Sequence, residues 1–298
     1  MSRLARPRVS HPPAPFVVGV GRSGTTLLRL MLDAHPQLAI PPETHFAPQV
    51  IERGRAGATP QELVVEITGA RGFADFGIEA ESLRDQVAGL GSADPAEILR
   101  TFYGLYADAH GKSRWGDKTP IYVTKMRTIG AVLAEARFVH LIRDGRDVAL
   151  SRRKRGMGAG KPIANTAERW RDRIENARRQ ARRLRGRYLE LRYEDLVTNP
   201  EPALRRVCEL IRLDFDPAML SHHDRAGKRL AELGDLAGKG PRRDRPAGER
   251  QEAHALAAQP PTGQRIEVWR GEMDPADRAE FERVAGALLV ELGYDVPS

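Results

Sequence analysis

The segment at residues 16–26 constrains the fold of this chain more than any other. It reads Phe-Val-Val-Gly-Val-Gly-Arg-Ser-Gly-Thr-Thr, a short apolar run that passes into a glycine-rich turn and then into a helical pattern. A strand, a turn and a helix in this order present backbone N–H groups and a helix N-terminus to an anion, usually a phosphate. The segment therefore predicts an anion site at the end of a strand in an α/β sheet.

Two well-known nucleotide loops come close to this turn, and neither fits it fully. Two of the glycines have Walker A spacing, but Thr25 stands where that loop carries the lysine that reaches the β- and γ-phosphates. The glycines also have the spacing of a dinucleotide loop, and Glu43 lies about where the ribose-binding acid would be. Glu43, however, follows two prolines and not a second strand with its crossover helix. A third interpretation is a loop that holds a diphosphate-like group and places Arg22 where charge is transferred.

Short apolar runs alternate with longer helical patterns along the chain. The best strand candidates are residues 16–20, 137–142 and 188–191, and helical patterns cover residues 96–109, 123–134, 164–184 and 203–212. Buried strands that alternate with helices are typical of a parallel sheet covered on both faces. We therefore expect an α/β fold with three layers, α/β/α, around a central parallel sheet.

Composition and charge indicate a soluble globular protein that binds anions. Hydrophobic residues make up 41% of the 298 positions, and no apolar stretch approaches the roughly 18 residues of a membrane helix. The net charge of +8 suits polyanionic ligands, including nucleotides and nucleic acid. Residues 1–14 are basic and proline-rich without an apolar run, so we expect a disordered tail, no signal peptide and a cytoplasmic protein. Residues 15–298 are expected to form a single domain.

The stretch at residues 224–264 has the least regular pattern of the chain and is rich in Gly, Pro, Arg and Lys. A long segment without regular structure inside a compact domain is usually a functional lid or a disordered loop. We interpret this one as a mobile cover over the active site. A final helical pattern at residues 275–292 follows, with Asp274 as its cap and Gly293 as its stop.

A second anion motif follows the strand candidate at residues 137–142. The chain continues as Arg143-Asp-Gly-Arg-Asp-Val-Ala-Leu-Ser151, so that an arginine ends a strand and a helix begins after it. Ser151 lies about two helical turns later and can face the same side as Arg143. An arginine fork with a hydroxyl suits a phosphate monoester, although Arg143 could instead pair with Asp144 or Asp147. Two phosphate sites on neighbouring strands suggest a nucleotide phosphorylated at both ends.

Together the two motifs resemble those of the PAPS-dependent sulfotransferase family, where PAPS is 3′-phosphoadenosine 5′-phosphosulfate. Residues 21–36 are similar to the tyrosylprotein and bacterial branches in particular, and weaker matches lie at residues 116–120, 193–196 and 265–270. The resemblance implies a P-loop-like fold in which the first loop holds the 5′-phosphosulfate and the second holds the 3′-phosphate. It assigns donor binding to Gly21, Arg22, Ser23, Gly24, Thr25, Thr26, Arg143, Ser151, Tyr193 and Arg265.

Sulfuryl transfer explains why the first loop lacks the Walker lysine. Like phosphoryl transfer, it has a loose in-line transition state that needs positioning and charge stabilisation. A sulfuryl group carries less charge than a phosphoryl group and can manage without a magnesium clamp, so we expect no metal. Arg22 would stabilise the charge that grows on the departing phosphate. Lys118 resembles a lysine that contacts the sulfuryl group in related branches; its alternative role is a surface ion pair with Asp117.

The acceptor hydroxyl must lose a proton, which requires a general base. Glu43 matches the glutamate that follows the first helix in the tyrosylprotein-like branch, and burial there would raise its pKa toward the working range. His45 is the second candidate for the base. The acceptor hydroxyl belongs to a sugar, a lipid, a secondary metabolite or a tyrosine, and neither fold nor motif chooses among them.

Three other classes of protein fit the sequence less well. A P-loop nucleotide-dependent kinase or phosphotransferase is the main alternative, but it needs a loop lysine and a metal-binding acid after a strand. A nicotinamide-dependent oxidoreductase would need a second strand before Glu43. A nucleic-acid binder would use the arginine-rich pattern at residues 169–187, where aromatic residues are not interleaved with the charge. We therefore expect no nucleic-acid partner.

Overall fold

The central sheet of the molecule is parallel and has the strand order β4–β1–β5–β6. The protein is described here by a computed structural model, which covers residues 11–157, 160–236 and 244–296. β1 (Ala14–Gly19) pairs with β4 (Asp117–Lys118) on one side and with β5 (Ala136–Ile142) on the other. β6 (Tyr188–Arg192) pairs with β5 and forms the far edge. The carboxyl ends of these strands therefore meet along one edge of the sheet.

Alternate side chains of β1 enter two different hydrophobic cores. Phe16 and Val18 pack in a cluster with Phe138 of β5, whereas Val17 packs in a second cluster with Leu141. All six residues of β1 are buried. A strand that is apolar on both faces needs helices on both sides of its sheet. The predicted three-layer fold around a parallel sheet is confirmed.

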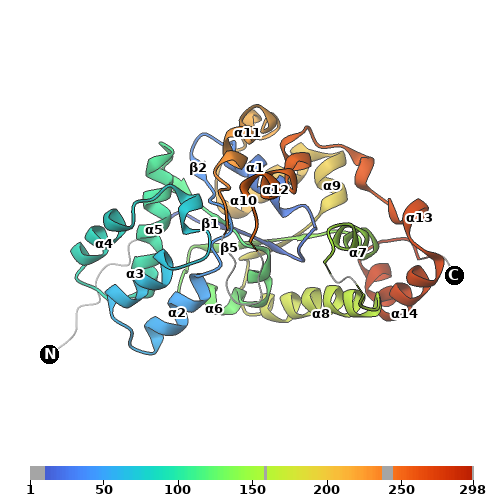
Figure 1. Cartoon of the computed structure of the whole chain (residues 1–298), viewed down its shortest axis with the longest axis horizontal. Coiled ribbons are helices and arrows are strands. Elements are labelled where there is room, and N and C mark those ends of the chain that lie inside the picture. The colour runs from blue at the N-terminus through green and yellow to red at the C-terminus, as the bar shows by residue number, and fades with distance from the viewer. Residues whose placement is uncertain (1–10, 158–159, 237–243, 297–298) are drawn as a thin grey trace.

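Helices account for most of the regular structure. In chain order they are α1 (Thr25–Asp33), α2 (Ala47–Arg55), α3 (Pro60–Thr68), α4 (Ala80–Gly89), α5 (Pro95–Ala109), α6 (Met126–Gly130), α7 (Gly145–Lys154), α8 (Ala164–Ala181), α9 (Tyr193–Thr198), α10 (Pro200–Ile211), α11 (His223–Ala231), α12 (Ala247–Glu252), α13 (Trp269–Glu272) and α14 (Pro275–Glu291). β2 (Leu38–Ala39) and β3 (Arg114–Trp115) form a separate two-stranded parallel sheet. In Figure 1, α2–α5 gather at the left, α1 and α9–α12 lie above the sheet, and α7, α13 and α14 lie at the right.

Most of the predicted elements are present, with shifted ends. The three strand candidates correspond to β1, β5 and β6, and three helical patterns correspond to α5, α8 and α10. The single helix predicted over residues 123–134 is wrong, because a 3₁₀ helix, η2 (Pro120–Thr124), is followed by the short α6. Lys125 has φ −126° and ψ 12° between them, which breaks the helix. The buried Val123, Met126 and Ile129 imitate helical spacing although the backbone is interrupted.

The expectation of little regular structure over residues 224–264 is wrong for the described part of that stretch. It contains α11, α12 and two 3₁₀ turns, η4 (Ala255–Ala258) and η5 (Gly263–Arg265). Residues 237–243 lie outside the described residues. Arg250 ties α12 to the body of the protein through Nη2 and the carboxylate of Asp75, 2.5 Å apart. A basic side chain held in a buried ion pair gave no apolar signal in the sequence.

The two ends of the described chain differ in how well they were predicted. Ala14 belongs to β1 and is buried, so the tail expected over residues 1–14 ends earlier than predicted, and residues 1–10 lie outside the described residues. The predicted cap of the last helix is confirmed, since Asp274 Oδ1 accepts hydrogen bonds from the N–H groups of Ala276 and Asp277. Gly293 follows α14 with φ 76°. Within the described ranges, every helix is too short or too polar to cross a membrane.

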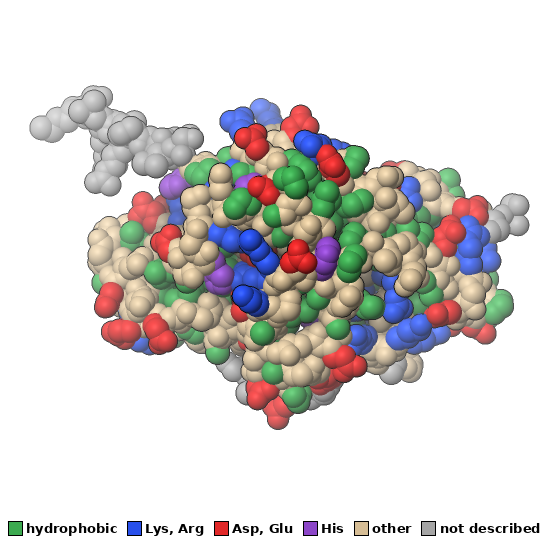
Figure 2. Space-filling model, turned by 90° about the horizontal axis from the view of Figure 1, so that it is seen from above, with side chains coloured by type: hydrophobic (Ala, Val, Ile, Leu, Met, Phe, Trp, Pro, Cys, Tyr) green, Lys and Arg blue, Asp and Glu red, His purple; other side chains and the backbone are tan. Residues whose placement is uncertain are grey.

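Arginines of the arginine-rich α8 form ion pairs with acidic side chains. Arg178 pairs with Glu190 at 2.8 Å and with Glu291 at 2.6 Å, and Arg171 pairs with Asp172 at 2.8 Å. The opposite side of the molecule, which Figure 2 shows from above, also has basic and acidic side chains interspersed. The ion pairs of Arg171 and Arg178 are typical of a solvated helix surface.

Candidate active site

The first loop turns sharply between β1 and α1. Arg22 and Gly24 both have left-handed backbone conformations, with φ 82° and φ 91°. A Cβ atom on Gly24 would lie 2.5 Å from a ring carbon of Tyr193, so the position has neither the room nor the conformation for another residue. The loop closes with a 3.1 Å hydrogen bond from the N–H of Ser23 to the carbonyl of Val20. This geometry directs the start of α1 toward the carboxyl edge of the sheet.

The second motif lies beside the first loop. Arg143 follows β5, and its Nη1 donates to the carbonyl of Arg22 at 3.3 Å while its Nη2 donates to that of Arg265 at 2.5 Å. Its guanidinium stacks over the ring of Tyr193 at 4.6 Å and forms an ion pair with Asp147 at 3.5 Å. The alternative pairing with Asp147 is therefore real, and it coexists with contacts to the first loop. Burial raises the pKa of Asp147 to about 6, although Arg143 opposes this rise.

Arg22 connects the two motifs directly. Its Nε donates a 3.1 Å hydrogen bond to Oγ of Ser151, which lies on α7. The pKa of Arg22 is lowered, first by burial and then by the nearby charges of Arg155, Arg143 and Arg152. A guanidinium keeps its proton at physiological pH. The repulsion among these buried like charges therefore favours binding of an anion. The cluster of arginines favours a ligand with several negative charges.

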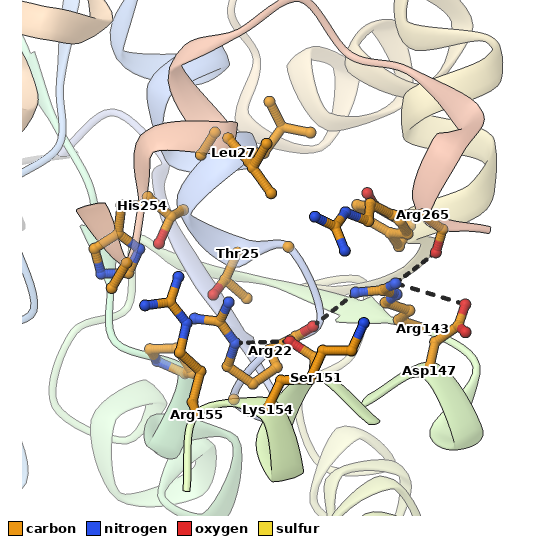
Figure 3. A pocket seen from close by; sticks show the side chains of 18 of the residues that line it. Arg22, Thr25, Leu27, Arg143, Asp147, Ser151, Lys154, Arg155, His254 and Arg265 are labelled. Carbon is orange, nitrogen blue, oxygen red and sulfur yellow. Dashed lines mark hydrogen bonds and ion pairs between the residues drawn. The ribbon is translucent and has the colours of Figure 1, made fainter. Parts of the chain in front are cut away.

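These residues line one cavity of about 530 Å³ (Figure 3). The predicted donor-binding residues in its wall are Gly21, Arg22, Gly24, Thr25, Thr26, Arg143, Ser151, Tyr193 and Arg265, and the predicted base Glu43 lines it as well. Ser23 does not line it: its side chain is buried beneath the loop, and its Oγ has no hydrogen-bond partner among the described residues. The structure thus gathers residues from the loops after β1 and β5 and from α1, α7, α9 and η5 around one space.

Glu43 and Lys118 form an ion pair at the edge of this cavity. Nζ of Lys118 lies 2.8 Å from Oε1 of Glu43, and Nε2 of His45 lies 3.0 Å from Oε2. The Lys118 side chain is 4% exposed, and that of Glu43 is 34% exposed. The alternative role of Lys118, a surface ion pair with Asp117, is therefore wrong. Lys118 instead lines a smaller cavity of about 110 Å³ on the other side of Glu43.

The ion pair reverses the expected pKa shift of Glu43. Burial raises the pKa of this carboxyl, but the charge of Lys118 and the hydrogen bond from His45 outweigh burial and hold it well below its usual range. The prediction of a raised pKa is wrong in this arrangement. It considered burial alone, because a partner 75 residues away leaves no local signal. The pKa of Lys118 is in turn lowered by burial, which Glu43 opposes.

Asp117 has a different role from the one considered for it. Its Oδ2 accepts hydrogen bonds from Oγ1 of Thr44 at 2.8 Å and from the hydroxyl of Tyr103 at 2.9 Å. Burial raises the pKa of Asp117 to about 6. Thr44 follows Glu43 and Asp117 precedes Lys118, so this buried network fixes the backbone on both sides of the ion pair. No local pattern in the sequence predicts this network.

Several cavity residues were not predicted as site residues. Arg155 lies four residues after Ser151, one turn further along, and this spacing could have identified it. His254 comes from the segment after α12, and no motif surrounds it in the sequence. Ile121 and Leu256 line the same cavity and are 38% and 64% exposed. As for metals, the described residues contain no group of three or more His, Cys, Asp or Glu side chains placed to hold an ion.

Comparison with known proteins identifies the family. Residues 13–217 match the sulfotransferase family. Protein-tyrosine sulfotransferase 1 of Danio rerio is 25% identical over 289 residues, covering 95% of this chain and 72% of that protein. Nodulation protein NoeE of Sinorhizobium fredii (strain NBRC 101917 / NGR234) is 28% identical over 308 residues, covering 94% of this chain and 65% of that protein.

A solved sulfotransferase structure is similar to this chain over almost its full length. The sulfotransferase domain from the olefin synthase of Synechococcus PCC 7002 has a TM-score of 0.64 and 25% sequence identity, covering 99% of this chain and 100% of that domain. The family match begins just before β1 and includes both anion motifs together with Glu43 and Lys118. The chain belongs to the sulfotransferase family and is an enzyme of that class.

Proposed function

We propose that this enzyme transfers the sulfuryl group of PAPS to an acceptor hydroxyl. The observation that carries the proposal is the contact between Arg22 and Ser151, which brings the two anion motifs into one cavity. A nucleotide with phosphate groups at both ends of its ribose needs two cationic sites at a fixed distance. A P-loop kinase needs only the first site, and it needs a lysine where this chain has Thr25.

The donor would lie along the cavity between its two cationic ends. Arg143 and Ser151 would bind the 3′-phosphate through charge-assisted hydrogen bonds. The N–H groups of residues 21–26, the start of α1 and the Arg22 guanidinium would bind the 5′-phosphosulfate. Tyr193 lies between the two ends, since its ring contacts both Gly24 and Arg143.

Glu43, Lys118 and Arg22 would perform the chemistry. The acceptor oxygen forms a bond to sulfur, while the bond between sulfur and the bridging phosphate oxygen breaks in line with it. Glu43 takes the acceptor proton, and the bridging oxygen leaves with its electron pair on 3′-phosphoadenosine 5′-phosphate (PAP). Lys118 and Arg22 would stabilise this developing charge, which is greatest in the transition state.

Donor binding would also prepare the base. A sulfonate oxygen near Nζ of Lys118 competes with Glu43 for the same ammonium group. As Lys118 turns toward the sulfonate, Glu43 loses its strongest opposing charge, and its pKa rises toward the range of a general base. The ion pair therefore explains how a carboxyl with a low pKa can still accept a proton.

The acceptor is proposed only as a class. The zebrafish relative is named for protein tyrosine, whereas the name of the nodulation protein states no acceptor. We propose that the acceptor hydroxyl belongs to a molecule that is at least partly apolar, because Ile121 and Leu256 are exposed in the cavity wall beyond Glu43. Tyrosine, lipid and secondary-metabolite hydroxyls all fit this description.

Ligand-dependent stabilisation tests the proposal. PAP without magnesium should raise the melting temperature, because a ligand that binds only the folded state stabilises it. AMP, which lacks the 3′-phosphate, should give a clearly smaller shift at the same concentration. Equal or greater stabilisation by Mg-ATP would reject the proposal in favour of a phosphotransferase. Production of PAP from PAPS, followed by chromatography, tests the reaction without an identified acceptor.

A further inference from the structure

His254 lies where the larger cavity meets the smaller one. It stands between α12 and η4, in the segment that covers this side of the site. Figure 3 shows His254 at the opposite end of the larger cavity from Arg143 and Arg265. The two cavities share four residues of their walls: Thr26, Glu43, His45 and His254. The side chain therefore lies at the end where sulfur would be transferred, away from the 3′-phosphate.

The His254 ring is available to a ligand. Among the described residues, no hydrogen bond or ion pair engages either ring nitrogen of His254. The other histidine of the cavity, His45, is engaged by Glu43 at 3.0 Å. His35 and His140 are engaged as well, by the carbonyl of Asp214 and the hydroxyl of Tyr188. His254 is half-buried and lines both cavities, so a group bound there can act as the polar partner of its ring.

The surroundings keep this imidazole neutral. Burial lowers the pKa of His254 to about 3, and the charges of Lys118, Arg22 and Arg29 lower it further, while Glu43 opposes them. A neutral imidazole has one N–H to donate and one lone pair to accept. The same cations that prevent protonation attract an anionic group, so an oxygen of the donor is the partner that this environment favours.

We propose that His254 is a catalytic residue that donates its ring N–H to an oxygen of the sulfuryl group during transfer. The inference rests on the proposed function. In the loose transition state, charge spreads over the three equatorial oxygens of the sulfuryl group. Lys118 and Arg22 would attract the oxygen on the leaving side, and His254, which lines the smaller cavity together with Lys118, would bind an equatorial oxygen. His254 keeps its proton throughout, and the acceptor proton goes to Glu43.

A role as the base is the competing interpretation of the same histidine. It would require the ring to become an imidazolium among Lys118, Arg22 and Arg29, which the local field opposes. Donation of a hydrogen bond needs no change of charge. The two roles therefore differ in whether His254 titrates during the reaction.

Four variants separate these roles: His254→Ala, His254→Gln, His254→Asn and the control Glu252→Ala. Glu252 is exposed, lies two residues earlier and lines neither cavity. The measurements are the thermal shift caused by PAP and the rate of PAPS hydrolysis to PAP from pH 5 to 9. His254→Ala should lose about 10²-fold in rate, the usual effect of removing one transition-state donor, with an unchanged PAP shift. At least one of His254→Gln and His254→Asn should hydrolyse PAPS about tenfold faster than His254→Ala. Glu252→Ala should have the rate of the parent.

The pH profile distinguishes a role of His254 as hydrogen-bond donor from a role as general base. The acidic limb should keep its midpoint in His254→Ala, because the removed group is neutral in the parent. Loss of the limb in that variant, hydrolysis within twofold of the parent, or amide variants no faster than alanine would each overturn the inference. A parent that neither responds to PAP nor hydrolyses PAPS would instead reject the proposed function, which keeps the two failures distinct.

Discussion

Nε of Arg22 and Oγ of Ser151 are 3.1 Å apart, although 129 residues separate them in the chain. One belongs to the loop after β1 and the other to the helix after β5, and the two strands are direct neighbours in the sheet. Parallel pairing places both carboxyl ends on the same edge, so each loop reaches the other. The pairing of β1 with β5 therefore brings the two proposed phosphate sites next to each other.

The first prediction concerns the 3′-phosphate. Arg143→Ala should weaken PAP binding by about 1.5–3 kcal/mol, the usual range for hydrogen bonds to charged groups. AMP binding should change much less, because AMP has no 3′-phosphate. Arg153→Ala is the matched control, since Arg153 is on the exposed side of α7 and pairs with Asp277. Isothermal titration with both nucleotides makes the comparison, and equal losses for PAP and AMP would place the 3′-phosphate elsewhere.

The second prediction separates binding from chemistry at Glu43. Glu43→Gln should lower turnover by about 10²-fold, the typical contribution of a general base. PAP affinity should stay the same or increase, because Lys118 loses a competing carboxylate. The variant should also be less stable by about 1–3 kcal/mol, since the buried ammonium is left without its ionic partner. A Gln variant that keeps full turnover while His45→Ala is inactive would make His45 the base.

The third prediction uses the glycines of the first loop. Gly24→Ala should prevent PAP binding and destabilise the protein, because its Cβ would collide with Tyr193 and φ is 91°. Gly21→Ala should fold normally, since no atom lies within 4 Å of a Cβ at that position. Urea denaturation of both variants measures the contrast. Equal losses of stability would mean that the loop relaxes around the added methyl group.

The fourth prediction concerns the pH dependence of stability through Asp117. Its pKa is about 6 in the folded protein and 3.8 in its ordinary state, so the folded protein binds the proton more tightly. The parent should lose about 2–3 kcal/mol of stability through this group as pH rises from about 4 to above 6. Asp117→Asn removes that term, so its stability relative to the parent should rise between pH 5 and pH 8. Chemical denaturation across this range would detect it, and parallel curves would show that Asp117 does not titrate there.

Local signals in the sequence predicted the parts of the site that local structure builds. The turn after residues 16–20, Arg143 after its strand and Ser151 two turns later all follow from periodicity and spacing. Lys118 and Glu43 were identified only as separate residues, because their ion pair depends on the pairing of β2 with β3, which brings the segments after these strands together. The direction of the Glu43 pKa shift therefore could not be predicted.

Segments stabilised by buried charge were also missed. The stretch from α11 to η4 is fixed in part by Arg229 and Arg250, which form ion pairs with Asp33 and Asp75. Patterns of apolar residues do not reveal such ion pairs. The sequence of this folded segment therefore resembled that of a segment without regular structure. Whether this cover moves during turnover stays a prediction, as does the cytoplasmic location.

Under the proposed mechanism, the ion pair between Glu43 and Lys118 would impose an order on the two substrates. An acceptor that enters while the ammonium group holds the carboxylate meets a base that cannot take its proton. The donor must arrive first and draw Lys118 away. Steady-state kinetics should therefore show sequential addition in which PAPS binds first, and an abundant acceptor should not be turned over until PAPS has bound.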